Sequence, residues 1–294
     1  LRCTPDGQVL RLPGARSLID FNRDWEPRLA AGRKQLWQDK SAGLQEVRKV
    51  TGIRPSAALG SAKVETGRKL TRQGVSIQHV VLQPEPGIWL PALRFEPETG
   101  ARTGEAVLYL HGEGKQVDAG PGGPIETLVR SGRTVLAVDV RGLGETSRPR
   151  GKDAMGAVLG FNSRDANLAY LLGKSFVAMR AEDVLACARY LVNSQPGSSP
   201  PARVAVVTIG EPGVPALHAV ALEPLLFSSL KIQRSLASWV DVVRTPVSRN
   251  QKVNVVFGAL RAYDLPDLVA SLPKEKIAIT EPLDATGQPV KAGR

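Results

Sequence analysis

Cysteine is scarce in this sequence, with two thiols, Cys3 and Cys187, in 294 residues. Two cysteines cannot supply the disulfide framework of a small secreted domain, and neither lies in the Cys/His spacing of a structural metal site. Cys187 falls on the apolar side of a helical pattern, which indicates a buried side chain. We therefore expect no disulfide, no metal ion and no cofactor.

Long apolar runs are also missing. No stretch approaches the roughly 18 residues needed to cross a bilayer, so we expect no membrane-spanning segment and no membrane partner. The chain begins with Leu1 rather than Met and shows no signal peptide, which is how a mature or excised piece of a longer chain would look. We leave its localisation open, because this start is compatible with export.

Aromatic residues make up only 5% of the chain. The net charge is +11. Such a charge raises the question of a polyanionic partner, but Lys and Arg are spread along the chain. Arg148, Arg150 and Lys152 form a short basic group without the interleaved aromatic residues that nucleic-acid grooves use. We expect a solvated basic surface and no nucleic-acid partner.

The apolar content is ordinary for a globular protein, at 42% of 294 residues, and can fill one core. We divide the chain into an N-terminal lead and helical extension over residues 1–73 and an α/β domain over 74–294. Residues 17–37 predict a long charged helix with apolar side chains at helical spacing. We expect these side chains, among them Phe21 and Trp25, to pack onto the body of the domain.

Period-two and continuous apolar patterns begin after residue 73 and predict strands. Residues 75–82 and 88–95 read as an antiparallel pair around a QPEPG turn. Residues 106–110, a helix near 125–129, and residues 134–140 then form a βαβ unit. This order predicts an α/β fold with a mostly parallel sheet and helices on both faces.

One stretch organises the rest of the chain: residues 204–222, VAVVTIGEPGVPALHAVAL. A β-branched apolar run breaks at Gly-Glu-Pro-Gly and resumes as a helix of small residues. This strand, turn and helix occupies the place of a nucleophile elbow, G-x-S-x-G. In that register Ile209, Glu211 and Gly213 stand on the three fixed positions, so a glutamate takes the place of the serine.

The runs LYLHGEG and VLAVDVRGLGET, together with this strand, turn and helix, resemble the α/β-hydrolase superfamily, in particular bacterial proteins similar to acetyl xylan esterases. The preceding helix, with Arg180 and Asp183 in an R-x-x-D pair, adds to the resemblance, and we expect a structural ion pair there. The resemblance implies an oxyanion loop at His111, Gly112 and Glu113.

By the same resemblance, the nucleophile position falls on Glu211 and the triad acid on Asp284, in a P-x-D loop. In the family, the last strand, the catalytic histidine and a closing helix follow this acid. The three histidines of this chain, His79, His111 and His218, all precede it. We therefore expect the last strand and the histidine loop to be missing.

Two functions follow from these residues. One is a carbohydrate ester hydrolase with little or no activity, because a carboxylate that attacks an acyl carbon forms an anhydride, which still needs an activated water and a base. The other is a pseudo-hydrolase module without catalysis. Its partner would be an acylated saccharide, or a catalytic domain on which the module packs.

Overall fold

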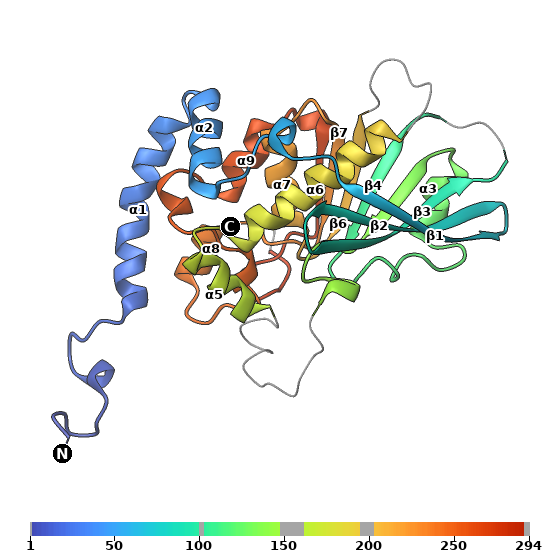
Figure 1. The fold of residues 1–294 in the computed structure, drawn as a ribbon. Helices are drawn as coiled ribbons and strands as arrows, with labels where there is room; N and C mark the ends of the chain where they lie inside the picture. Colours follow the sequence, from blue (N-terminus) through green and yellow to red (C-terminus); the bar gives the residue numbers. More distant parts are fainter. Residues whose placement is uncertain (1, 100–102, 148–161, 195–202, 291–294) are drawn as a thin grey trace.

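The computed structural model describes residues 2–99, 103–147, 162–194 and 203–290, and one eight-stranded sheet runs through them (Figure 1). The strands lie in the order β1-β2-β3-β5-β4-β6-β7-β8. They are β1 (Lys63–Arg72), β2 (Val75–Glu85), β3 (Ile88–Pro97), β4 (Ala106–His111), β5 (Thr134–Val138), β6 (Val204–Ile209), β7 (Phe227–Gln233) and β8 (Ile277–Thr280). The helices are α1 (Leu18–Leu36), α2 (Lys40–Thr51), α3 (Pro124–Arg130), α5 (Ser163–Leu171), α6 (Phe176–Asn193), α7 (Gly213–Leu222), α8 (Trp239–Arg244) and α9 (Leu265–Ser271).

The sheet is antiparallel at one end and parallel over the rest. β1, β2 and β3 pair antiparallel, as β3 does with β5, and β5, β4, β6, β7 and β8 pair in parallel. The predicted antiparallel pair is the β2–β3 hairpin, and the predicted βαβ unit is β4, α3 and β5 with Ala106 opposite Thr134. The mostly parallel α/β class is thereby confirmed.

Helices cover both faces of the sheet. On one face, Val107 and Tyr109 of β4 pack with Ile125 of α3. On the other face, Leu108 of β4 belongs to the main core, which α6 and α7 fill with their side chains. Because neighbouring residues of β4 point to opposite faces and both faces are covered, the strand reads as a continuous apolar run.

The sheet begins earlier than the sequence predicts. β1 lies in the segment assigned to the N-terminal extension, yet it pairs with β2 along its length. Its residues are mostly exposed and rich in charge, so they show no apolar alternation. The division of the chain at residue 73 itself stays a prediction.

The predicted N-terminal helix is confirmed as α1, and its expected packing is confirmed at its end but wrong at its start. Leu36 and the following Trp37 pack against the main core. Phe21 and Trp25 are 54% and 58% exposed, and the buried residues of the helix are Glu26 and Arg33. α1 turns its charged side towards α8 and towards the short 3-10 helix Ala259–Arg261, where the Leu260 carbonyl accepts from the Arg33 guanidinium at 2.5 Å. Figure 1 shows the start of α1 and the preceding segment extending away from the sheet.

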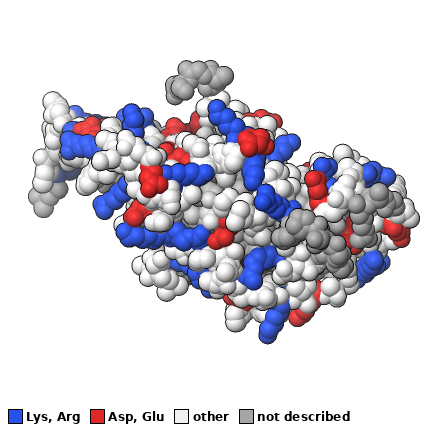
Figure 2. Space-filling model, turned by 90° about the horizontal axis from the view of Figure 1, so that it is seen from above, with Lys and Arg blue, Asp and Glu red and all other residues white. Residues whose placement is uncertain are grey.

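The described sheet ends at the edge strand β8. Among the residues described up to 290, no strand follows it; residues 282–290 form a loop in which Leu283 bridges to Leu236 and Pro289. None of the helices in the described ranges is long and apolar enough to cross a membrane. On the face in Figure 2, Lys and Arg are dispersed among acidic residues.

Candidate functional site

The predicted elbow follows β6, which lies within the parallel part of the sheet. It therefore stands at the carboxyl ends of the parallel strands, where ligands of α/β proteins usually bind. β6 ends at Ile209, and the chain turns through Gly210 into α7. Gly210 has φ +77°, a conformation that favours glycine, and its carbonyl accepts from the Gly213 N–H at 3.1 Å. The left-handed position of the turn, where a nucleophile elbow carries its nucleophile, is therefore Gly210, one residue before Glu211, to which the sequence pattern assigned it.

The turn packs closely against the neighbouring strand. A Cβ atom at Gly213 would lie 2.4 Å from the Ser235 hydroxyl oxygen, so the start of α7 tolerates only glycine in this arrangement. The Gly210 N–H donates to the Gln233 carbonyl at 2.8 Å, which fixes the tip of the turn to the end of β7.

The Glu211 carboxylate forms an ion pair with Arg180 of α6, through Nη1 of the guanidinium. Arg180 has no exposed surface, while the Glu211 side chain is 27% exposed. The Arg180 Nε also donates to the Arg141 carbonyl at 2.8 Å, and its guanidinium lies 4.3 Å from the centre of the Phe176 ring. The carboxylate is thus held by a cation that the core itself fixes.

The R-x-x-D pair of α6 is structural, but its two members do not bind each other. Asp183 accepts from Arg141, at 2.8 Å from Nε, while Arg180 turns to Glu211. Both partners are supplied by loops at the carboxyl edge of the sheet. The Arg180 Nη2 atom is buried without an acceptor among the described residues.

The predicted oxyanion loop after β4 has its amides occupied. The Gly112 N–H donates to the Ile209 carbonyl at 2.9 Å, and the Glu113 N–H donates to Nδ1 of His111 at 3.1 Å. The Gly114 N–H donates to the His111 carbonyl at 3.0 Å. A neutral imidazole has one donor and one acceptor nitrogen, so the acceptor of His111 is used by its own loop.

His218 lies on α7 and is buried in the core. Its Nδ1 donates to the Val214 carbonyl and its Nε2 accepts from the Tyr263 hydroxyl, both at 2.7 Å. Burial lowers the pKa of His218 to about 4, so the ring is neutral near pH 7. The remaining histidine, His79, lies exposed on β2, which is four strand positions from β6, or about 19 Å.

Asp284, in the predicted acid position, organises its own loop. Its carboxylate accepts from the N–H and hydroxyl groups of Thr286, at 2.8 and 2.7 Å, and from the Gln288 N–H at 3.0 Å. Burial would raise the pKa of Asp284, but these hydrogen bonds outweigh it and hold the pKa below its usual value. No hydrogen bond joins this carboxylate to a histidine in the described ranges.

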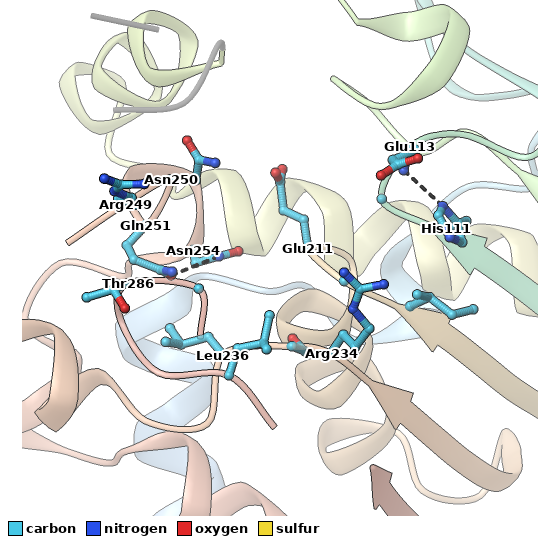
Figure 3. Close-up of a pocket in the computed structure, with 16 residues that line it drawn as sticks. His111, Glu113, Glu211, Arg234, Leu236, Arg249, Asn250, Gln251, Asn254 and Thr286 are labelled. Carbon is cyan, nitrogen blue, oxygen red and sulfur yellow. Dashed lines mark hydrogen bonds between the residues drawn. The ribbon is translucent and has the colours of Figure 1, made fainter. Parts of the chain in front are cut away.

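A cleft of about 460 Å³ opens above the turn, and both His111 and Glu211 line it (Figure 3). Figure 3 shows the Glu211 side chain pointing into it, with His111 and Glu113 of the predicted oxyanion loop on one side. Sequence reasoning missed the polar residues of the other walls: Arg234, Arg249, Asn250, Gln251 and Asn254. The available signal was position, since Arg234 directly follows β7 at the carboxyl edge of the sheet.

Metal ligands are not gathered anywhere in the part of the chain that the structure describes. No group of three or more His, Cys, Asp or Glu side chains there has the geometry to hold an ion. The cleft instead offers amide, guanidinium and carboxylate groups, which bind polar organic molecules by hydrogen bonds.

Known proteins resemble this chain in structure but not detectably in sequence. No family model matches it, and no curated protein matches it. A Bacteroides fragilis protein described provisionally as an acetyl xylan esterase has a TM-score of 0.67 and 14% identity, covering 95% of this chain and 77% of that one. A methylesterase has a TM-score of 0.58 and 15% identity, covering 89% of this chain and 54% of that one.

A third solved structure is acetyl xylan esterase 1 from a Thermoanaerobacterium species. It has a TM-score of 0.50 and 18% identity, and the match covers 86% of this chain and 90% of that one. At these identities the likeness concerns the fold. Together with the strand order and the strand, turn and helix at Gly210, it shows that this chain has the α/β-hydrolase fold.

Proposed function

We propose that this chain is a pseudo-hydrolase module, which binds a saccharide in the cleft above Gly210 and does not hydrolyse it. The observation that carries the proposal is the ion pair between Glu211 and the buried Arg180. A guanidinium stabilises the carboxylate as an anion and uses one of its oxygens, and the pair holds the side chain in place. Such a carboxylate suits a structural or ligand-contacting role better than an attack on an acyl group.

The absence of an available base supports the same proposal. Ester hydrolysis by this fold needs a nucleophile, a histidine that takes its proton and an acid that orients the histidine. His218 is bonded inside the core, His79 lies on a distant strand, and His111 uses its acceptor nitrogen within its own loop. None of the three is placed to activate Glu211 or a water molecule beside it.

The backbone donors support it as well. An oxyanion hole needs N–H groups that are free to meet a developing negative charge. Both Gly112 and Glu113 donate within the protein, and the strained position of the turn, where the fold normally carries its nucleophile, is a glycine without a side chain.

Ester hydrolysis is the second candidate. It is favoured by the names of the structural neighbours, which include acetyl xylan esterases, and by the Glu211 N–H, for which no hydrogen bond is found among the described residues. This donor directly follows the strained glycine, as the oxyanion donor of the fold follows its nucleophile. A carboxylate nucleophile would still form an anhydride that requires a base.

Hydrolysis of an aryl acetate separates the two candidates. The wild-type protein, Glu211→Ala and the control Glu65→Ala on the exposed strand β1 are incubated with 4-nitrophenyl acetate, and the release of nitrophenolate is followed. We expect rates equal to that of buffer alone for all three. Saturable turnover that Glu211→Ala abolishes and Glu65→Ala retains would establish the esterase instead.

A further inference from the structure

The cleft contains two arginine side chains for which none of the described residues supplies a counter-charge. Arg234 follows β7 and Arg249 follows α8, and both are exposed. For neither guanidinium is a hydrogen bond or an ion pair found among the described residues, whereas Arg180 and Arg141 at the same edge of the sheet bind carboxylates. Free guanidinium groups inside a concave site indicate a ligand that brings its own negative charge.

The charge balance of the cleft points in the same direction. Of its two carboxylates, Glu211 is already paired with Arg180, and Glu113 lies exposed at the rim. Within the described ranges, two arginines without an ion pair therefore face one carboxylate without an ion pair. An anionic ligand meets a favourable potential there, even with Glu113 ionised.

The backbone aims Arg234 into the cleft. Its φ of +54° is unusual for a residue with a long side chain, and its N–H is fixed to the Thr280 carbonyl at 3.1 Å. Figure 3 shows its guanidinium projecting between Glu211 and His111. A strained residue that the surrounding loops hold in place is a common feature of ligand sites.

The opposite wall offers amide groups. Gln251 and Asn254 are 9% and 5% exposed, and the Asn254 Nδ2 donates to the Gln251 Oε1 at 3.1 Å. The Asn254 Oδ1 is buried and has no donor among the described residues. A hydroxyl group is the natural partner for such an oxygen, because it both donates and accepts.

We propose that the cleft binds a sugar acid, with the carboxylate of the ligand on Arg234 and its hydroxyl groups along the amide wall of Asn250, Gln251 and Asn254. This inference rests on the proposed function, because it names the ligand class of the same cleft. A guanidinium takes a carboxylate through two parallel charge-assisted hydrogen bonds, which gives orientation as well as affinity. Arg249 adds positive charge at the mouth of the cleft.

Titration calorimetry with D-glucuronate and with D-glucose tests this inference. The two sugars differ in a carboxylate at one carbon, so they share the amide wall and differ at Arg234. We expect glucuronate to bind at least about tenfold more tightly, from the charge-assisted pair. Arg234→Gln removes this preference, Arg249→Gln reduces it, and Arg68→Gln on the exposed strand β1 leaves it unchanged.

Equal affinity for the two sugars, no binding of either, or an unchanged preference in Arg234→Gln would each overturn the inference. The melting temperature of each variant shows that it is folded. Equal, saturable binding of both sugars leaves the saccharide-binding module in place and removes only the ligand class. Glu211-dependent turnover of an aryl acetate removes the proposed function itself, whichever sugar binds.

Discussion

Glu211 links the elbow to the helix that precedes it, through one buried ion pair. Arg180 has no exposed surface, so its charge depends on this carboxylate for compensation. We predict that Glu211→Gln lowers the free energy of unfolding by about 1–3 kcal/mol, less than for a fully buried pair because Glu211 is 27% exposed. Urea unfolding measures the change.

Glu113→Gln is the matched control, since this glutamate lies exposed at the rim of the same cleft and no ion pair of its side chain is found among the described residues. It should change the free energy of unfolding by less than about 0.5 kcal/mol. Equal effects of the two substitutions would show that the ion pair does not stabilise the elbow.

His218 makes the stability depend on pH. Its pKa is about 4 in the folded protein, against 6.5 for an ordinary histidine, so between these values the unfolded chain binds a proton that the folded chain does not. Its contribution is therefore complete above pH 6.5 and falls as the pH drops towards 4, by up to about 1.4 kcal/mol per pH unit.

We predict that His218→Asn removes this part of the pH dependence, whereas His79→Asn on the exposed face of β2 leaves it unchanged. Free energies of unfolding between pH 7 and pH 4 give the slopes. The same slope in wild type and His218→Asn would contradict a neutral, buried imidazole.

For single residues, the sequence predicted the kind of interaction better than it predicted the partner. The helix pattern places Arg180 and Asp183 three positions apart and indicates an ion pair, but the actual partners come from loops 31 and 42 positions away along the chain. Such distances in sequence carry no local signal. Arg234 was missed although it directly follows a strand, because its role becomes clear only when β7 is placed between β6 and β8.

At the scale of elements, α1 is held by charge as well as by packing. Glu26 is 3% exposed and accepts from Arg33 at 2.8 Å and from Arg244 of α8 at 2.5 Å. Burial opposes its ionisation, but the two arginines outweigh this and keep the pKa of Glu26 below its usual value. The contribution is thus present at neutral pH and is lost as the pH falls below about 4.

We predict that Glu26→Gln destabilises the docked helix by about 2 kcal/mol or more, because it leaves Arg33 buried without a carboxylate. Hydrogen exchange of the α1 amides should then become faster than in the control Glu46→Gln. Glu46 makes an exposed pair with Lys49, which contributes little. Unchanged exchange in α1 would show that apolar contacts alone hold the helix.

Elements that are buried on both sides were predicted well, and elements with an exposed side were predicted poorly. β4 and β5 are buried along nearly their whole length, so each reads as a continuous apolar run. β1 is mostly exposed and gave no pattern. For α1, helical spacing shows which residues share a face, but not how much of that face the body covers. Leu36 packs against the core, whereas Phe21 and Trp25 are exposed and the charged residues Glu26 and Arg33 are buried.

At the scale of the whole molecule, the sheet brings five segments together at one edge. The elbow, the loop after β4, the end of β7, the loop after α8 and the loop after β8 all line the cleft, although they span residues 111–287. The strand order explains this, because the carboxyl ends of parallel neighbours meet at the same edge. The fold therefore supplies the location of a site, and the residues decide its chemistry.

An apolar stripe on α1 is exposed to solvent: Leu18, Phe21 and Trp25 are each more than half exposed. This agrees with the proposal that the module packs on another domain, which stays a prediction. The dispersed positive charge gives no continuous basic patch on the face in Figure 2, and the expected absence of a nucleic-acid partner likewise stays a prediction.

The central claim is that the cleft binds a saccharide and leaves it intact, and one NMR experiment tests both halves at once. The wild-type protein is mixed with an acetylated oligosaccharide that carries a uronic acid, and the ligand and free acetate signals are followed in the same sample. We predict broadened or shifted ligand signals and no protein-dependent increase in acetate. Acetate release in proportion to protein concentration, lost in Glu211→Ala, would contradict the account.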